Sequence, residues 1–225
     1  MKREAYSGIV RVPWWGIASS GLAPVVLVAG WTVAADLQPT PFDAVQRSIS
    51  SLAAAGMPYR WIVTIAILGV GVCNIVTGLA LRAAPDGGRV LLMAGGVCSI
   101  LIAANPQPPG GGSLAHEVSS LAGTVIMTLW PAAAIRRQPY VPFGLRPRVA
   151  WAVVGLNLTL LLWFAAQLFH GTELGLVFHG TELGLAERTV TAYQALWPFI
   201  VVLTVVTARP RAREPVLTEA SVRNL

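Results

Sequence analysis

Long apolar stretches dominate the pattern of hydrophobic and polar positions along this chain. Six of them occupy residues 16–35, 61–81, 90–104, 118–135, 149–169 and 189–208. A helix that crosses the hydrocarbon core of a bilayer needs about 20 mainly apolar residues. Five of the stretches fit that length, and the third is short but has flanking residues that can extend it. The pattern therefore predicts an all-α fold, a polytopic bundle of six transmembrane helices in a single membrane domain (1–225) with a tail at 209–225.

Residues 41–55, between the first two stretches, have the pattern of a short amphipathic helix. Thr40 can cap its start, Pro41 suits the first helical position, and Gly56 and Pro58 supply a stop. At this length the helix cannot cross a bilayer. We expect it at the outer face, either packed on the bundle as an ordinary loop helix or acting as a lid over a cavity between the long helices.

The two faces of this expected helix differ in polarity. Four apolar residues recur at helical spacing on one side: Val45, Ile49, Leu52 and Ala53. The polar residues Gln46, Arg47, Ser50 and Ser51 lie largely opposite. Asp43 and Arg47 are four residues apart with the acid first, which is the favourable order for an ion pair on a helix.

The amino-acid composition is typical of a membrane protein, and this affects how the net positive charge is interpreted. The chain is 55% hydrophobic and 12% charged, whereas a soluble domain carries about 25% charged residues. A net charge of +6 could indicate a nucleic-acid partner. The basic residues, however, are sorted by predicted membrane side, so we expect no nucleic-acid binding and take membrane lipids as the surrounding partner.

Lys and Arg residues concentrate on one predicted side of the membrane. With the N-terminus in the cytoplasm, the inner segments hold Lys2, Arg3, Arg11, Arg82, Arg89, Arg136, Arg137, Arg146, Arg148, Arg209, Arg211, Arg213 and Arg223. The outer segments hold only Arg47, Arg60 and Arg188. Cytoplasmic loops carry such an excess. This predicts a multi-pass protein of the inner (plasma) membrane with both termini cytoplasmic.

Acidic residues and histidines gather at the predicted outer side. The outer segments hold Asp36, Asp43, Glu117, Glu173, Glu182, Glu187, His116, His170 and His179. No Asp, Glu, Lys or Arg lies in the middle of a predicted span, which counts against an ion-coupled pump. Any chemistry is therefore expected at the outer mouth, with His116, Asp43 and Glu187 as the candidate acid–base residues.

A polar stripe descends from that mouth along the fourth span. Ser113 can cap a helix that begins at Leu114, and His116, Ser120, Thr124 and Thr128 then recur every four residues. These side chains either bond their own backbone and a neighbouring helix, as is common in membrane bundles, or line a polar cavity with His116 at its rim.

The segment FHGTELGLVFHGTELGL, which begins at Phe169, repeats nine residues in tandem. His170 and His179 lie nine positions apart, so on one helix they would point to opposite sides. Metal ligands on a helix need spacings such as i, i+4. We therefore expect a tolerated duplication, no metal site and no cofactor. Cys73 and Cys98 lie within predicted spans and are expected to be free thiols.

Several motifs resemble a known family, the bacterial integral membrane proteins grouped as domain of unknown function 998, especially the actinobacterial members. They are GW (30–31), QP (38–39), FDAVQRSISSLAA (42–54), YRW (59–61), GVCNIVTGLALR (71–82), NPQP (105–108) with GS (112–113) and His116, and GLAER…QALWP (184–198). The resemblance implies a six-helix polytopic protein and no established activity. The family pattern has one short loop before GLAER, so the extra nine residues here depart from it.

The motif positions and the stripe together define a set of candidate residues at the outer mouth. Candidate ligand-binding residues are Asp43, Arg47, Ser48, Ser50, Asn105, His116, Ser120, Glu187 and Arg188. Three functions remain open at this point: a protein that binds or moves a lipid or isoprenoid-like molecule, an integral membrane enzyme that acts on such a molecule, or a scaffold subunit. The sequence leaves the ligand and the oligomeric state undetermined.

Overall fold

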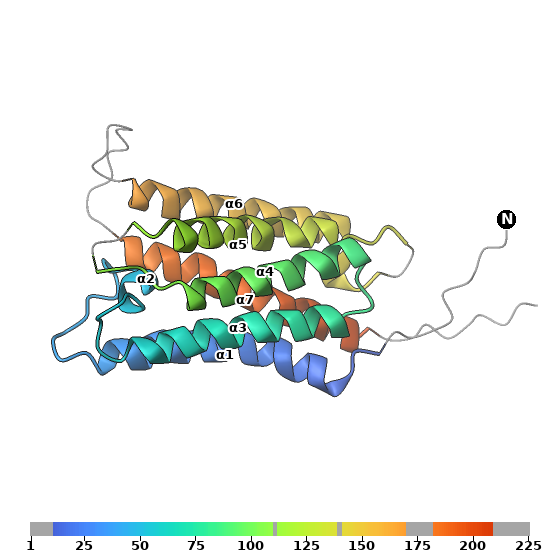
Figure 1. The fold of residues 1–225 in the computed structure, drawn as a ribbon. Helices are drawn as coiled ribbons and strands as arrows, with labels where there is room; N and C mark the ends of the chain where they lie inside the picture. The colour runs from blue at the N-terminus through green and yellow to red at the C-terminus, as the bar shows by residue number, and fades with distance from the viewer. Residues whose placement is uncertain (1–10, 110–111, 139–140, 170–181, 209–225) are drawn as a thin grey trace, which may run out of the picture.

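The computed structural model describes residues 11–109, 112–138, 141–169 and 182–208, and within these ranges the chain is helical. Six long helices run along a common axis (Figure 1). The elements are α1 (Trp14–Asp36), α2 (Ile49–Leu52), α3 (Arg60–Ala80), α4 (Asp86–Ala104), α5 (Leu114–Ala133), the 3-10 turn η1 (Phe143–Leu145), α6 (Pro147–Leu168) and α7 (Leu183–Val206). No strand is present in the part of the chain that the structure describes.

Contacts between successive long helices arrange the bundle as a closed ring. Each long helix packs on the next one in the sequence, and α7 packs on both α6 and α1. It also touches α3 and α5, so the last helix fills the middle of the bundle. The short helix α2 lies at one end of the bundle, where α1 ends and α3 and α7 begin (Figure 1). We call this the α2 end.

Close backbone approaches hold the first helices together. A Cβ atom added to Gly71 of α3 would lie 2.6 Å from the carbonyl oxygen of Gly96 in α4, and one added to Gly96 would lie 2.5 Å from that of Gly71. Only glycine permits this distance, and small residues at a crossing let membrane helices pack by direct backbone contact. The α3–α4 pair is therefore a tightly packed hairpin.

Among the described residues, five helices are long and apolar enough to cross a membrane: α1, α3, α4, α6 and α7. The prediction of several helices with the length and hydropathy of membrane spans is thus confirmed. Helix α5 spans 20 residues and packs between α4 and α6, but it is not among these five. Its polar stripe, which begins at His116, lowers its hydropathy. The predicted number of six spans is therefore not confirmed by length and composition.

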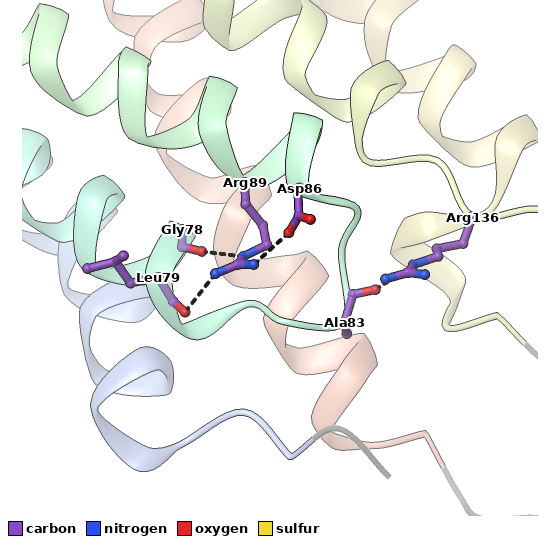
Figure 2. A network of polar contacts seen from close by, with 6 residues as sticks. All are labelled: Gly78, Leu79, Ala83, Asp86, Arg89 and Arg136. Carbon is purple, nitrogen blue, oxygen red and sulfur yellow. Dashed lines mark hydrogen bonds and ion pairs between the residues drawn. The ribbon is translucent and has the colours of Figure 1, made fainter. Parts of the chain in front are cut away.

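Helix α4 begins before the predicted apolar stretch 90–104, because Arg89 anchors its first turn. The Arg89 guanidinium donates to the carbonyl oxygens of Gly78 (3.0 Å) and Leu79 (3.4 Å) at the end of α3 and to Asp86 Oδ1 at 2.8 Å (Figure 2). These bonds satisfy carbonyls that a helix end leaves without partners. The short span was therefore extended by flanking residues, as expected.

The predicted amphipathic helix at residues 41–55 is wrong in extent. Only Ile49–Leu52 is helical, and Ser48 rather than Thr40 caps it, because the Ser48 hydroxyl accepts the N–H of Ser51 at 2.9 Å. The expected apolar face is kept in part: Ile49, Leu52 and Ala53 are buried, whereas the Val45 side chain is 46% exposed.

Asp43 explains why the helix does not begin earlier. Its Oδ1 accepts the N–H groups of Val45 and Gln46, both at 3.0 Å, so the carboxylate folds a turn. The expected Asp43–Arg47 ion pair is not formed among the described residues. The Arg47 guanidinium instead lies over the Phe42 ring, 4.5 Å from its centroid. Residues 42–57 thus form a largely irregular segment that includes α2, which we call the outer strap after its predicted side of the membrane.

Candidate functional site

The first two turns of α7 hold the outer strap against the bundle. The N–H of Leu185 donates to the carbonyl oxygen of Val45 at 2.9 Å. A single nitrogen, Arg188 Nη1, donates to the carbonyl oxygens of Ala44 (2.7 Å) and Arg47 (2.9 Å). These bonds satisfy backbone acceptors in a part of the strap that has no regular structure. The strap is therefore fixed to the last helix of the bundle.

Gly184 allows this close approach. A Cβ atom added there would overlap the carbonyl oxygens of both Arg47 and Ala44. The neighbouring Arg188 guanidinium lies 5.9 Å from the Phe42 ring and 6.0 Å from the Trp31 ring, which is favourable for a cation. Its second terminal nitrogen, Nη2, is buried without an acceptor among the described residues.

Glu187 binds the start of α2. Its Oε2 accepts the N–H of Ile49 at 2.5 Å, and its Oε1 accepts the hydroxyl of Ser50 at 3.1 Å. A carboxylate is favourable there because the first N–H groups of a helix have no partner within the helix. The acid that was predicted as a catalytic candidate therefore has a structural role in holding α2.

His116 lies on the other side of Ser50. Its side chain is 3% exposed, and its Nε2 is 3.2 Å from Ser50 Oγ while its Nδ1 is 3.0 Å from the carbonyl oxygen of Asn105. Ser113 caps α5 as predicted, because its hydroxyl accepts the N–H of His116 at 3.4 Å. The three residues His116, Ser50 and Glu187 form a continuous chain of polar contacts from α5 through α2 to α7.

The donor and acceptor inventory of this chain admits two complete proton arrangements. The Asn105 carbonyl only accepts, so His116 Nδ1 carries a proton. In the first arrangement His116 Nε2 is also protonated and donates to Ser50, whose hydroxyl donates to ionised Glu187. In the second, protonated Glu187 donates to Ser50, whose hydroxyl donates to His116 Nε2. The two arrangements differ only by the shift of one proton along each of the two bonds.

This arrangement can therefore pass a proton between His116 and Glu187 without changing its net charge. The same bonds occupy the Ser50 hydroxyl on both sides, so Ser50 is not presented as a free nucleophile. The N–H groups beside it are also taken, since Ser51 donates to Ser48 and Ile49 donates to Glu187. These two N–H groups are therefore not available to stabilise an oxyanion.

The structure brings together only part of the predicted candidate set. His116, Ser50 and Glu187 form the chain, Asn105 joins it through its backbone carbonyl, and Arg188 and Ser48 hold the strap and α2. Asp43 is exposed and folds its own turn, and the Ser120 hydroxyl joins none of these contacts. The repeated segment falls largely on residues 170–181, outside the described residues.

The polar stripe on α5 is used for packing. Thr124 and Thr128 each donate to a carbonyl oxygen four residues earlier, at 2.8 Å. Gln194 of α7 donates to Thr128 Oγ1 at 3.2 Å and to the Thr124 carbonyl at 3.3 Å. Gln194 was not among the residues predicted from the sequence, although it lies seven positions after Glu187 and therefore on the same face of α7. The stripe thus joins α5 to α7.

A hollow of about 400 Å³ lies beside the strap. Its lining is Arg47, Ser51, Ala54, Ala55, Gly56, Met57, Gln107, Pro108 and Pro109. The N–H of Ala55 donates to the Gln107 carbonyl at 2.7 Å, which joins the strap to the loop after α4. Gly56 has a φ of +88°, a conformation that glycine adopts easily. Arg47 has no acidic partner among the described residues.

The described residues contain no group of three His, Cys, Asp or Glu side chains placed to hold a metal ion. Cys73 and Cys98 are free and buried, as predicted.

Comparison with known proteins gives one match. A family model described as a protein of unknown function, DUF998, matches residues 22–204. No curated protein and no solved structure matches the chain. The matched region runs from within α1 to the last turn of α7, so it includes the strap, Ser50, His116 and Glu187.

Proposed function

Because this chain belongs to the DUF998 family of proteins of unknown function, we propose its role from the site itself: it binds or moves an amphipathic molecule of lipid or isoprenoid type in the hollow beside the outer strap. The observation that carries the proposal is the lining of that hollow. It combines a guanidinium that lacks an acidic partner with apolar side chains, at the end of a bundle of membrane-crossing helices.

The hollow suits a molecule with a polar head and an apolar body. Arg47 and Gln107 offer hydrogen-bond donors, whereas Met57 and Pro108 offer apolar surface. Its volume of about 400 Å³ falls in the range of small-molecule sites, roughly 300–1,000 Å³. The guanidinium favours an anionic head group such as a phosphate or carboxylate.

The proposal includes six spans, with α5 as the fourth. Helix α5 lies between α4 and α6, two helices that can cross the membrane, and packs on both. The polar stripe of α5 is hydrogen-bonded within the bundle, because Gln194 donates to Thr128 Oγ1 and to the Thr124 carbonyl. Such hydrogen bonding lets a polar helix face lie at membrane depth. Six spans, together with the basic residues at the end opposite α2, support a topology with both termini in the cytoplasm and the strap outside.

Native mass spectrometry of the protein, extracted gently from its own membranes, tests the proposal. We expect a discrete adduct of lipid mass on the unchanged chain, with lower occupancy in Arg47→Gln and in Ala55→Leu, which fills the hollow. Arg60→Gln is the matched control, because it removes an arginine from the same end but outside the lining. A bare protein, or equal adducts in all variants, would contradict the proposal.

The second candidate is an enzyme that acts on the same kind of molecule. It is favoured by the proton-sharing chain His116–Ser50–Glu187, in which Ser50 adjoins Ser51 of the hollow's lining. General acid–base catalysis needs a proton donor and acceptor near the substrate. His116→Asn would then abolish conversion of the bound adduct while its occupancy stayed unchanged. Loss of the adduct itself in His116→Asn would speak for a purely structural role of the chain.

A further inference from the structure

The opposite end of the bundle carries a second, more basic hollow. It measures about 580 Å³ and is lined by Pro85, Ala132, Ile135, Arg136, Arg137, Gln138 and Trp151. These residues come from the start of α4, the end of α5 with the residues after it, and the second turn of α6. We infer that this hollow binds the phosphate head group of an anionic phospholipid, with Arg136 and Arg137 as its ligands.

Two hydrogen bonds hold Arg136 in place and leave the terminal nitrogens of its guanidinium without partners among the described residues. Its backbone N–H donates to the Leu145 carbonyl at 2.9 Å, and its Nε donates to the Ala83 carbonyl at 2.9 Å (Figure 2). These two bonds fix the direction of the guanidinium, while its terminal nitrogens make no hydrogen bond within the described residues. A preorganised guanidinium that keeps free donors is well suited to a phosphate.

Arg137 is exposed and has no hydrogen-bond or acidic partner among the described residues. Arg89, a short distance along the same end, shows the contrast: its guanidinium is occupied by Gly78, Leu79 and Asp86 (Figure 2). Asp86 is thus already paired, and no acidic residue lines the hollow. The charge of Arg136 and Arg137 is therefore left for an anion from outside the chain.

The remaining lining points to a lipid as the source of that anion. The Trp151 side chain is 58% exposed, and Trp rings sit at the level of lipid head groups. Below the hollow, α5 presents Val125 and Leu129, which are 39% and 45% exposed and lie on the same helix face as Ala132. An acyl chain can lie along this apolar face while the head group reaches the arginines.

The test uses the purified full chain in a neutral detergent, with native mass spectrometry as the readout. Phosphatidylglycerol and phosphatidylcholine with identical acyl chains are added separately. We expect tighter binding of phosphatidylglycerol and a loss of about five-fold in its affinity in Arg137→Gln, the effect typical of one basic residue at a lipid surface. Arg137→Lys should retain most of the binding.

Arg82→Gln is the matched control, because Arg82 is an exposed arginine at the same end that does not line the hollow. Equal losses in Arg82→Gln and Arg137→Gln, or equal binding of the two lipids, would overturn the site. Inorganic phosphate is added as a competitor in a further arm. Displacement of phosphatidylglycerol by equimolar phosphate would overturn the lipid assignment in favour of a free phosphate, whereas no displacement supports it.

Discussion

The Ser50 hydroxyl donates to the Glu187 carboxylate at 3.1 Å although the two residues are 137 positions apart in the chain. Ser50 lies between the first two long helices, and Glu187 lies in the second turn of the last one. Together with the hydrogen bond from the Ile49 N–H to the same carboxylate, this contact joins α2 to α7 at the α2 end. The conformation of the outer strap therefore depends on a helix from the other end of the sequence.

Glu187→Leu should loosen the outer strap. A leucine side chain has no acceptor, so the Ile49 N–H loses its partner and the Ser50 hydroxyl loses one of its two partners. We expect a loss of about 1–3 kcal/mol in stability and faster hydrogen exchange in residues 42–57. Glu182→Leu is the control, because that side chain is exposed. Unchanged exchange in the strap would contradict the role given to Glu187.

Gly184→Ala should separate α7 from the strap, because the added methyl group overlaps the carbonyl oxygens of Ala44 and Arg47. We expect a lower midpoint of thermal unfolding in detergent. Gly155→Ala in α6 is a control with the opposite expected sign, since nothing lies within 4 Å of its added Cβ and alanine favours a helix by about 1 kcal/mol. Equal effects of the two substitutions would contradict the close approach at Gly184.

Ser50→Ala should expose His116 to modification. The buried imidazole loses the partner of its Nε2, so we expect faster reaction of His116 with diethyl pyrocarbonate, measured by peptide mapping. Ser51→Ala is the matched control, because the Ser51 hydroxyl donates only to the nearby Ser48 carbonyl. The same rate of modification in both variants would show that Ser50 does not secure His116.

Arg89→Lys should destabilise the α3–α4 hairpin even though it keeps the positive charge. An ammonium group cannot reach the Gly78 and Leu79 carbonyls and Asp86 together as the planar guanidinium does. We expect a loss of about 1–2 kcal/mol, seen as a lower thermal midpoint, and little change in Arg82→Lys. A stability equal to that of the unchanged chain would mean that charge alone matters there.

Asn157→Leu should stabilise the bundle. The Asn157 side chain is 1% exposed, and its Oδ1 is buried without a partner among the described residues. Removing an unsatisfied buried acceptor recovers about 1–3 kcal/mol, offset by the lost bond from Nδ2 to the Val153 carbonyl. The thermal midpoint should rise. A marked fall would show that Oδ1 has an acceptor role in the intact protein.

The long helices could be predicted from the sequence because a bilayer imposes both their length and their hydropathy. The predicted span 61–81 corresponds to α3 (Arg60–Ala80), and 149–169 corresponds to α6 (Pro147–Leu168). The Ser113 cap of α5 was predicted because a capping residue acts within one turn of its own helix. Features that depend on local chemistry were thus accessible from the sequence alone.

The outer strap could not be predicted in the same way. Its apolar spacing favours one helix over residues 41–55, but Asp43 and Ser48 each bond nearby N–H groups and divide the segment. Glu187 then fixes the shorter helix from a distant part of the chain. The charge pattern located the candidate residues at one end, whereas the pairing of Ser50 with His116 and Glu187 follows from the packing of α5 and α7.

The order in which the ribosome makes these elements has a consequence for assembly. The outer strap is synthesised after α1, but its anchors Gly184, Glu187 and Arg188 belong to α7, the last helix among the described residues. Its exposed carbonyls and the start of α2 stay without their partners until that helix is inserted. Closure of the strap thus requires that α7 is in place, and a chain that stops before α7 leaves these backbone groups of the strap without their partners.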